Sequence, residues 1–472
     1  MFQTVTLPLW LLVLILAFAA VTFASHFLFP SVRWFFRRRM ERVVAKLNER
    51  LERPIQPFKL ARRTDMIQRL LYDPTVIEAV AAHAAETGVR EDVAFQQAKR
   101  YAREIVPAFS ATAYFGFAIR FARWLSTRLF HVRLGHHDEA GLAGIDKDAT
   151  IVFVMNHRSN MDYVLVTYLA AERSALSYAV GEWARIWPLQ SLIRAMGAYF
   201  IRRRSRNALY RRVLARYVQL ATAAGVAQAV FPEGGLSLNG KVGTPRLGIL
   251  NYIISEFNPA NRDVVFVPVA INYDRVIEDR ILIEAEKAGE RRFRGTLVSG
   301  ALFTARYIWR RITGKAQRFG YASVSFGEPL SLTSFQGRTD KDLTASVGAE
   351  LMARIRRVVP VLPVPLMALF MRGTETPLSR DTLIARTEAA IETLTRAGTP
   401  ASINGGSPPE IVDAGLRHLE MRHIVKPVDG GFLAAADADD VLAFYSASIE
   451  HLLDASAATA PEDLPQIAAI ET

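Results

Sequence analysis

Short apolar runs alternate with longer amphipathic stretches between residues 132 and 335. Apolar runs of this length, bounded by turn-forming residues, are typical of buried strands, and the stretches between them have helical periodicity. Repeated strand and helix units predict an α/β domain that is layered around a mixed sheet. The expected strands are residues 150–155, 175–180, 227–231, 264–272 and 321–326, and the clearest helices are residues 206–224 and 245–257.

The region before this domain, residues 33–131, is predicted to be helical. One helix is expected to start at Asp73-Pro74, which supplies a cap and a first-turn proline, and to end at Gly88. Residues 107–130 are aromatic and apolar with arginines between them. Such a segment is either an amphipathic helix at a membrane interface or a core helix with a basic outer face, and the pattern leaves both open.

The region after the domain, residues 336–454, is predicted to be mostly helical with one short β-like run at 424–432. Residues 358–371 are apolar but interrupted by prolines and too few to span a bilayer, so they are expected to be buried. The tail, residues 455–472, is rich in Ala and Pro and is expected to be disordered.

The N-terminal 32 residues contain no Asp, Glu, Lys or Arg, and residues 7–29 are apolar almost throughout. This length is close to the roughly 20 residues that cross a bilayer core. Aromatic and basic residues follow at 33–39, as expected at the cytoplasmic end of an anchor. A secretory signal peptide is the alternative, but its charged start is missing. The sequence therefore predicts a transmembrane helix over residues 1–32.

Charge and cysteine content narrow the classes of function. The formal net charge is +12, which indicates an anionic partner such as nucleic acid, a membrane surface or a phosphorylated substrate. There is no cysteine, which excludes disulfides, thiolate metal sites and a cysteine nucleophile. A winged-helix module in the C-terminal region is disfavoured because residues 410–432 are not notably basic, so no nucleic-acid partner is expected.

The strongest candidate for chemistry is the heptad at residues 156–162, Asn-His-Arg-Ser-Asn-Met-Asp. His157 ends an expected strand, and Asp162 begins an expected helix five positions later. A carboxylate at that distance can accept the proton of one ring nitrogen, fix the tautomer and stabilise the imidazolium that forms when the base takes a proton. A neutral histidine of this kind suits deprotonation of a hydroxyl. The alternative is a His and an Asp that only cap a helix.

Three further stretches fall in the same domain. Residues 197–204 end in a cluster of arginines, which suits phosphate oxygens or anionic lipid heads. Residues 231–237, Phe-Pro-Glu-Gly-Gly-Leu-Ser, follow a strand, and their glycines allow backbone N–H groups to approach an anion. Residues 267–273 form a strand with a proline near its start, which by itself indicates only structure.

Other motifs are disfavoured. Residues 235–241 fit G-x-x-x-x-G-K, but Val242 stands where a phosphate-binding loop needs Ser or Thr. Residues 235–239 lack the final glycine of a hydrolase nucleophile elbow. His136 and His137 would point to opposite faces of a strand, so a polar turn is preferred to a metal site, and no metal is expected.

In order and content, the four stretches resemble the motif blocks of the H-x-x-x-x-D glycerolipid acyltransferases. His-Arg-Ser-Asn-Met-Asp-Tyr, Phe-Ile-Arg-Arg and Pro-Glu-Gly-Gly are closest to the glycerol-3-phosphate acyltransferase branch. Residues 70–106 and 442–453 resemble that branch as well, so the likeness covers most of the chain after residue 32. It implies that residues 132–335 are an acyltransferase domain.

The resemblance also implies roles for individual residues. His157 would be the general base and Asp162 would orient it. The other implied or suspected substrate-binding residues are Arg158, Arg202, Arg203, Glu233, Gly234, Gly235, Ser237, Lys241 and Pro268, the last at the wall of the acyl site. The third block of the family usually reads Glu-Gly-Gly-Arg-Ser, and Leu236 replaces the arginine here. We hypothesise that Lys241 supplies the lost charge, with Arg246 and Arg158 as further candidates.

The implied activity is transfer of a fatty acyl chain from acyl-CoA or acyl carrier protein to the sn-1 hydroxyl of glycerol 3-phosphate, giving lysophosphatidate. No cofactor and no covalent enzyme intermediate are needed. The expected partners are glycerol 3-phosphate, the acyl donor and membrane phospholipids, at the cytoplasmic face of the inner membrane. The alternatives are acylation of lysophosphatidate or dihydroxyacetone phosphate, or a non-catalytic lipid-binding scaffold.

Overall fold

The structure is a computed structural model that describes residues 8–19, 22, 38, 42, 44–169, 175–181, 189–202, 207–289, 318–337, 342–398, 403 and 406–458. The chain divides into two compact units, one of residues 1–55 and 172–174, the other of residues 56–171 and 175–472. The second unit contains all four motif blocks.

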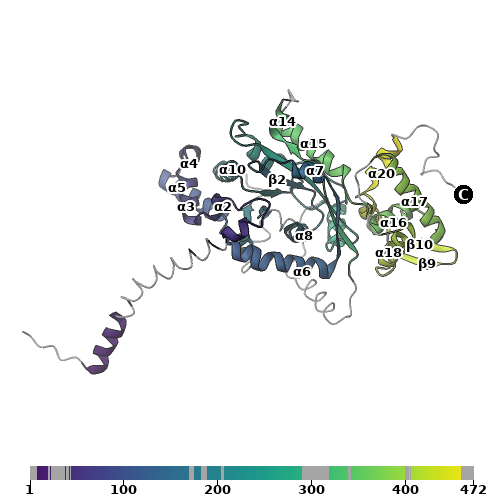
Figure 1. Ribbon diagram of the computed structural model, residues 1–472, viewed down its shortest axis with the longest axis horizontal. Helices are drawn as coiled ribbons and strands as arrows, with labels where there is room; N and C mark the ends of the chain where they lie inside the picture. Colours follow the sequence, from purple (N-terminus) through teal and green to yellow (C-terminus); the bar gives the residue numbers. More distant parts are fainter. Residues whose placement is uncertain are drawn as a thin grey trace, which may run out of the picture. The chain divides into compact units, whose positions relative to one another are not determined.

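The described part of the first unit does not contain the expected transmembrane helix. Residues 9–19 and residue 22 are helical (Figure 1). Among all described residues, no helix has the length and apolar character to cross a bilayer. The prediction of a transmembrane helix over residues 1–32 is therefore wrong, and its remaining positions (1–7, 20–21 and 23–32) lie outside the described residues.

The core of the second unit is a mixed eight-stranded sheet in the order β1-β7-β6-β2-β5-β3-β4, with the short β8 pairing with β6 (Figure 1). In the central part of the sheet, β6, β2, β5 and β3 are all parallel to one another, while β7 is antiparallel to β6. The strands are β1 His131–His137, β2 Thr150–Met155, β3 Ser177–Gly181, β4 Tyr199–Ile201, β5 Gln228–Val230, β6 Val264–Tyr273, β7 Tyr321–Phe326 and β8 Leu330–Ser331. The predicted mixed α/β sheet is confirmed.

Continuous apolar sequence explains why the central strands were predictable. Every residue of β2 and β6 is buried, as expected for strands that are covered on both faces. Helix α15 (Leu343–Arg357) packs against β6, and α10 (Ala208–Ala223) packs against α11 (Gly248–Ile254). The other helices of this part are α7 Glu139–Ala143, α8 Met161–Leu169, α9 Leu189–Ala195, α12 Asp279–Lys287 and α14 Leu332–Gln336.

Pro268 occupies a position in β6 that tolerates the absence of an N–H group. Its carbonyl accepts a hydrogen bond of 2.8 Å from the Gly327 backbone N–H. Because the N and C=O of one strand residue point to the same side, the Pro268 nitrogen also faces the segment that contains Gly327. Gly327 lies between β7 and β8, where the antiparallel ladder along β6 is interrupted. No ladder hydrogen bond is lost there, which explains a proline inside a buried strand.

Among the helices before the sheet, α4 (Pro74–Thr87) begins and ends where local sequence signals predict. The Asp73 side chain accepts a hydrogen bond of 3.1 Å from the Thr75 N–H at the start of α4, and Gly88 ends that helix with a positive φ of 69°. The helices are α2 Pro57–Leu60, α3 Arg63–Leu71, α4 Pro74–Thr87, α5 Glu91–Ile105, the π-helix η1 Thr112–Ala118 and α6 Ile119–Leu129.

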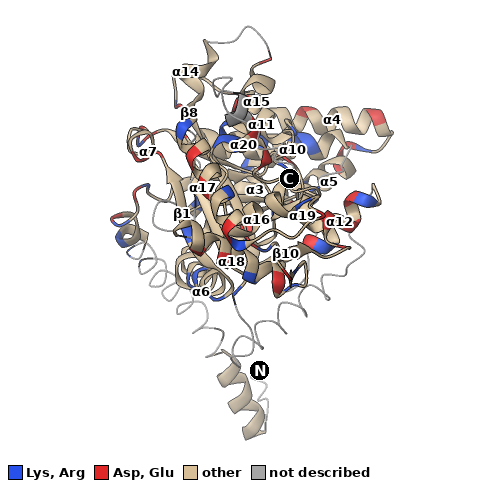
Figure 2. Ribbon diagram, turned by 90° about the vertical axis from the view of Figure 1, so that its right-hand side faces the viewer, with Lys and Arg blue, Asp and Glu red and all other residues tan. Residues whose placement is uncertain are grey.

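The C-terminal part is helical with one hairpin, as predicted (Figure 2). Helix α16 (Pro363–Met371) is buried along nearly its whole length, and its prolines stand in the first turn, where a missing N–H is tolerated. The β-like run forms the hairpin of β9 (Val425–Val428) and β10 (Gly431–Ala434). The remaining helices are α17 Arg380–Arg396, α18 Pro408–Glu420, α19 Asp439–Ser446 and α20 Glu450–Ala458. Residues 459–472 of the predicted tail lie outside the described residues.

Candidate active site

The candidate site is built at the carboxyl ends of three neighbouring parallel strands. The loop after β2 carries the heptad 156–162, the loop after β5 carries residues 231–237, and the end of β6 carries Tyr273. Strand β2 lies between β5 and β6, both of which come later in the chain. In open α/β sheets, such a change of direction in strand order leaves a crevice at the carboxyl ends where ligands bind.

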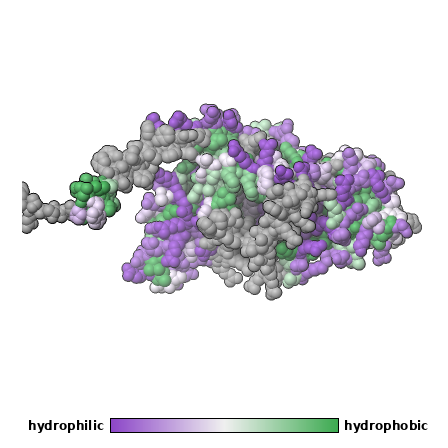
Figure 3. Space-filling model, turned by 90° about the horizontal axis from the view of Figure 1, so that it is seen from below, coloured by the Kyte–Doolittle hydropathy of each residue, from purple (hydrophilic) through white to green (hydrophobic). Residues whose placement is uncertain are grey.

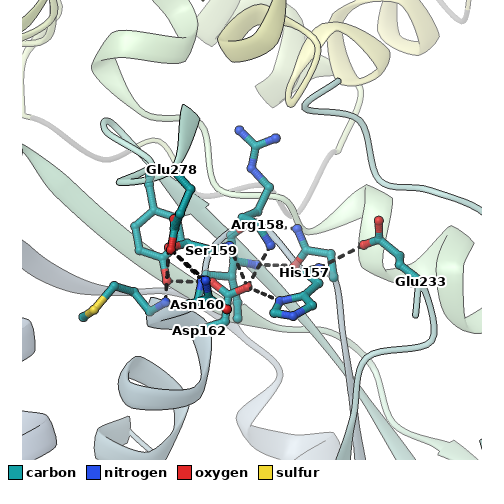
Figure 4. A network of polar contacts seen from close by, with 11 residues as sticks. His157, Arg158, Ser159, Asn160, Asp162, Glu233 and Glu278 are labelled. Carbon is teal, nitrogen blue, oxygen red and sulfur yellow. Dashed lines mark hydrogen bonds and ion pairs between the residues drawn. The ribbon is translucent and has the colours of Figure 1, made fainter. Parts of the chain in front are cut away.

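His157 and Asp162 are joined by a hydrogen bond of 2.9 Å between the ring Nδ1 and the carboxylate Oδ2 (Figure 4). The same Oδ2 accepts the backbone N–H groups of Arg158 at 2.7 Å and Ser159 at 3.0 Å. The other oxygen, Oδ1, accepts the hydroxyl of Tyr273 at 2.7 Å. Four donors therefore fix one fully buried carboxylate, and this carboxylate fixes the imidazole.

The imidazole is held in a dry, aromatic environment. Its ring stacks on Phe231 with centroids 4.1 Å apart and meets Tyr163 edge to face at 5.5 Å. Only 2% of the His157 side chain is exposed. Because Nδ1 carries the proton shared with Asp162, the neutral ring has its lone pair on Nε2, as a general base requires. Any group that reaches Nε2 therefore has to enter a space with little access for bulk water.

Glu233 connects the third block to the backbone of the first. Its carboxylate accepts the N–H of His157 at 3.0 Å and the N–H of Gly243 at 3.1 Å. A second hydrogen bond joins the same two blocks, because the Ser237 N–H donates to the His157 carbonyl at 2.8 Å. Burial raises the pKa of Glu233 to about 7, although its two backbone donors act in the opposite direction. In this arrangement Glu233 supports the base and does not face solvent.

The basic residues near the third block differ in their surroundings. Gly234 has a positive φ of 69°, and a Cβ there would collide with the side chain of Arg246, which lies across it. Arg246 is exposed. The ammonium group of Lys241, also exposed, lies 3.9 Å from Glu450 of α20, and the Ser237 hydroxyl donates to the Lys241 carbonyl at 2.7 Å. Arg246, more than Lys241, lies against Gly234 of the third block, and Gly235 follows Gly234 in the same bend.

The predicted phosphate-binding arginine Arg202 already holds a carboxylate. Its Nε and Nη2 donate to the two oxygens of Glu104 in α5, at 2.9 and 2.7 Å. Its guanidinium also lies over the rings of Tyr101 and Tyr210. This ion pair raises the pKa of Arg202 above its ordinary value. Arg203 lies outside the described residues.

Two other predicted residues are placed in packed surroundings. The Arg158 side chain is 1% exposed and, in Figure 4, extends away from His157 and Asp162. Pro268 lies level with Val154 inside the sheet, and its ring faces Gly327. Neither residue is brought against the imidazole by these contacts.

Sequence reasoning missed three residues that organise the site. Tyr273 supports Asp162, and Glu278 accepts hydrogen bonds from Ser159 and Asn160. Asn156 exchanges two hydrogen bonds with the backbone of Ile271, at 3.0 and 2.7 Å, which couples the end of β2 to β6. The only available signal was the Asn-Tyr pair that ends the fourth block, and nothing in the sequence pairs it with Asp162.

The family comparisons agree with this geometry. Residues 138–272 match the family model described as acyltransferase, and residues 310–460 match the model of the glycerol-3-phosphate acyltransferase C-terminal region. A glycerol-3-phosphate acyltransferase of Pseudomonas paraeruginosa is 30% identical over 354 residues, and one of Ectopseudomonas mendocina is 29% identical over 357 residues. These alignments cover 69% of this chain and 40% and 41% of the relatives, so the chain spans about two fifths of their length.

A solved structure of a 1-acyl-sn-glycerophosphate acyltransferase from Thermotoga maritima aligns with 51% of this chain and 76% of its own, at 19% identity and a TM-score of 0.32. That score is too low to support an argument about the fold. The fold and the His–Asp site define an acyltransferase domain of the H-x-x-x-x-D type. Both family models match in order, and together with these relatives they support assignment of the chain to the glycerol-3-phosphate acyltransferase branch of that family.

Proposed function

We propose that the protein transfers a fatty acyl chain from an acyl thioester, either acyl-CoA or acyl carrier protein, to the sn-1 hydroxyl of glycerol 3-phosphate, giving lysophosphatidate. The observation that carries this proposal is the buried His157–Asp162 pair, with a hydrogen bond of 2.9 Å and Asp162 fixed by three further donors. The match of residues 310–460 to the glycerol-3-phosphate acyltransferase C-terminal region supports the choice of acceptor.

The chemistry is a single displacement. The alcohol oxygen forms a bond to the thioester carbonyl carbon, the C–S bond breaks, and His157 Nε2 takes the hydroxyl proton and returns it to the leaving sulfur. Asp162 stabilises the imidazolium in between. The phosphate of the acceptor is expected to meet guanidinium groups near the third block, and Arg246 is the exposed arginine that lies across Gly234 there.

The decisive experiment incubates the full chain with labelled glycerol 3-phosphate and either palmitoyl-CoA or palmitoyl-acyl carrier protein, followed by identification of the lipid product. The His157→Ala variant is expected to lose transfer by about 10³-fold or more. Unlabelled lysophosphatidate and dihydroxyacetone phosphate are added as competing acceptors. A preference for either competing acceptor would show that the protein acylates that acceptor instead. Full activity of the His157→Ala variant would refute the role of His157 and favour a lipid-binding scaffold.

We further propose that the enzyme works at the cytoplasmic surface of the membrane, on which η1 and α6 lie. One face of this continuous helical segment is exposed and aromatic: Phe117, Phe121 and Trp124 are 54%, 43% and 39% exposed. Phe121 is 5.8 Å from Phe117 and 5.9 Å from Trp124 between ring centroids, so the three rings form one row. The opposite face, including Ala122 and Leu125, is buried in the fold.

The charge of this segment suits an anionic lipid surface. Arg120, Arg123 and Arg128 are exposed on α6, and no acidic residue occurs between Glu104 and Asp138. Figure 3 views the molecule from the side on which α6 lies in Figure 1, and it shows apolar surface next to strongly hydrophilic surface. Basic residues that flank exposed aromatics are typical of helices that lie in the membrane interface.

Vesicle sedimentation tests this location. The full chain is expected to pellet with vesicles that contain 30% anionic lipid and to remain in the supernatant with neutral vesicles. The Arg120→Ala/Arg123→Ala variant is expected to weaken vesicle binding about 30-fold, since each of the two basic residues contributes roughly 1 kcal/mol near an anionic surface. The matched control, Arg211→Ala/Arg212→Ala on α10, removes the same charge from another exposed helix and should leave pelleting unchanged. Equal losses in both variants would contradict docking by α6.

A further inference from the structure

Glu278, which stands outside all four motif blocks, holds the catalytic loop from the side opposite to Glu233 (Figure 4). Its carboxylate accepts the Ser159 hydroxyl at 2.8 Å and the Asn160 side-chain amide at 3.0 Å. Ser159 also presents its backbone N–H to Asp162. A displacement of Glu278 would therefore move the backbone that fixes the Asp162 carboxylate.

The residue after Glu278 is bound by the C-terminal part of the chain. Asp279 accepts the Tyr445 hydroxyl at 2.6 Å and forms an ion pair with Arg422. Arg422 also donates to the Tyr445 oxygen at 3.0 Å, and so does the Val276 N–H at 3.1 Å. Helix α19, which carries Tyr445, packs beside α12, as Figure 2 also shows. Glu278 is thus hydrogen-bonded to the loop that carries His157, whereas the next residue, Asp279, is bound to the C-terminal part of the chain.

A second contact joins the same helix to the catalytic loop directly. The Arg158 guanidinium lies over the Phe444 ring at 4.9 Å and donates to the Gly240 carbonyl. Gly240 has a positive φ of 85°, and the Phe444 backbone carbonyl approaches it so closely that no side chain would fit. Neighbouring residues of α19, Phe444 and Tyr445, therefore reach the loop by two routes.

We infer that the C-terminal helical region positions the catalytic His–Asp pair, and that Glu278 and Tyr445 are positioning residues acting through Ser159. The turn from Val276 to Asp279 transmits the position of α19 to the loop that carries His157. This inference rests on the proposed acyl transfer for its kinetic test, but its structural test does not.

The kinetic test uses the full chain with two conservative substitutions, Glu278→Gln and Tyr445→Phe. Each is expected to lower kcat about tenfold while KM for both substrates stays within twofold, because a misplaced base slows the chemical step without touching bound substrate. The double variant is expected to be no slower than the slower single variant, since both act through one route. A multiplicative loss, or unchanged kcat in an active preparation, would overturn the inference.

The structural test measures backbone hydrogen exchange in peptides that cover residues 156–163. Both variants are expected to exchange at least tenfold faster there, where the Arg158 and Ser159 N–H groups bind Asp162. The matched control is Arg380→Gln, which breaks an exposed ion pair with Asp413 in the same C-terminal region and should leave this peptide unchanged. Unchanged exchange in both Glu278→Gln and Tyr445→Phe would refute the inference even if the wild-type chain transferred no acyl group to glycerol 3-phosphate.

Discussion

The Asp162→Asn substitution separates the charge of the site from its shape. An asparagine can present its carbonyl where Oδ2 now stands, and so keep the N–H groups of Arg158 and Ser159 and the proton on His157 Nδ1. Its amide group would face Tyr273, whose hydroxyl can turn from donor to acceptor. The fold of the loop should therefore survive, and the negative charge is what the variant lacks.

That charge matters when His157 takes a proton. Opposite charges about 4 Å apart interact by about 4 kcal/mol at an effective dielectric constant of about 20. Since about 1.4 kcal/mol changes a rate tenfold, kcat should fall roughly 10³-fold. The assay is steady-state acyl transfer with saturating donor, together with a thermal melt to verify folding. KM for the acceptor should change little, and the His157→Ala/Asp162→Asn variant should be no slower than His157→Ala. A fall in kcat of less than tenfold in a folded variant would refute the assigned role of the carboxylate.

Three further predictions follow from the surroundings of the site. Arg246→Ala should raise KM for glycerol 3-phosphate at least tenfold and Lys241→Ala less than threefold, because Arg246 lies across Gly234 whereas Lys241 faces Glu450. Initial rates measured against acceptor concentration give both KM values, and a larger increase for Lys241→Ala would assign the phosphate contact to Lys241. Glu104→Gln should lower the free energy of unfolding by about 2 kcal/mol, because the Arg202 guanidinium loses the carboxylate that it holds with two hydrogen bonds; an unchanged midpoint in urea would argue against this. The folded-state pKa of Glu233, about 7, is above its ordinary value of 4.5, so the folded chain keeps a proton that the unfolded chain loses, and this contribution to stability is lost as pH rises from about 4.5 to 7. The free energy of unfolding of Glu233→Gln, relative to that of wild type, should therefore rise by up to about 3 kcal/mol between pH 5 and pH 8. A difference in melting temperature between the two proteins that stays constant over this range would contradict the assignment.

Local pattern was sufficient to predict the central strands and the pairing of His157 with Asp162. The strand at 150–155 is apolar throughout and buried throughout, and a strand followed by a helix start places His157 and Asp162 on one turn. The same reasoning failed at the N-terminus, because hydropathy reports apolar content, whereas no helix among the described residues has both the length and the apolar character to cross a bilayer.

The rest depends on residues that are distant in sequence. Tyr273 meets Asp162 across 111 positions, and Glu278 meets Ser159 across 119. Arg202 was expected to bind phosphate, but its Nε and Nη2 already donate to Glu104, 98 positions earlier in the chain. No periodicity or spacing rule pairs such residues, since only the folded arrangement of strands and helices brings them together.

The aromatic enclosure of His157 bears on a competition that any alcohol acylation faces. A base able to activate a glycerol hydroxyl can activate water just as well, and water is present at far higher concentration. With Phe231 against one face of the ring and Tyr163 at its edge, solvent has almost no access to the imidazole. In the proposed reaction, this exclusion of solvent would protect the acyl thioester from hydrolysis until the acceptor hydroxyl reaches the imidazole.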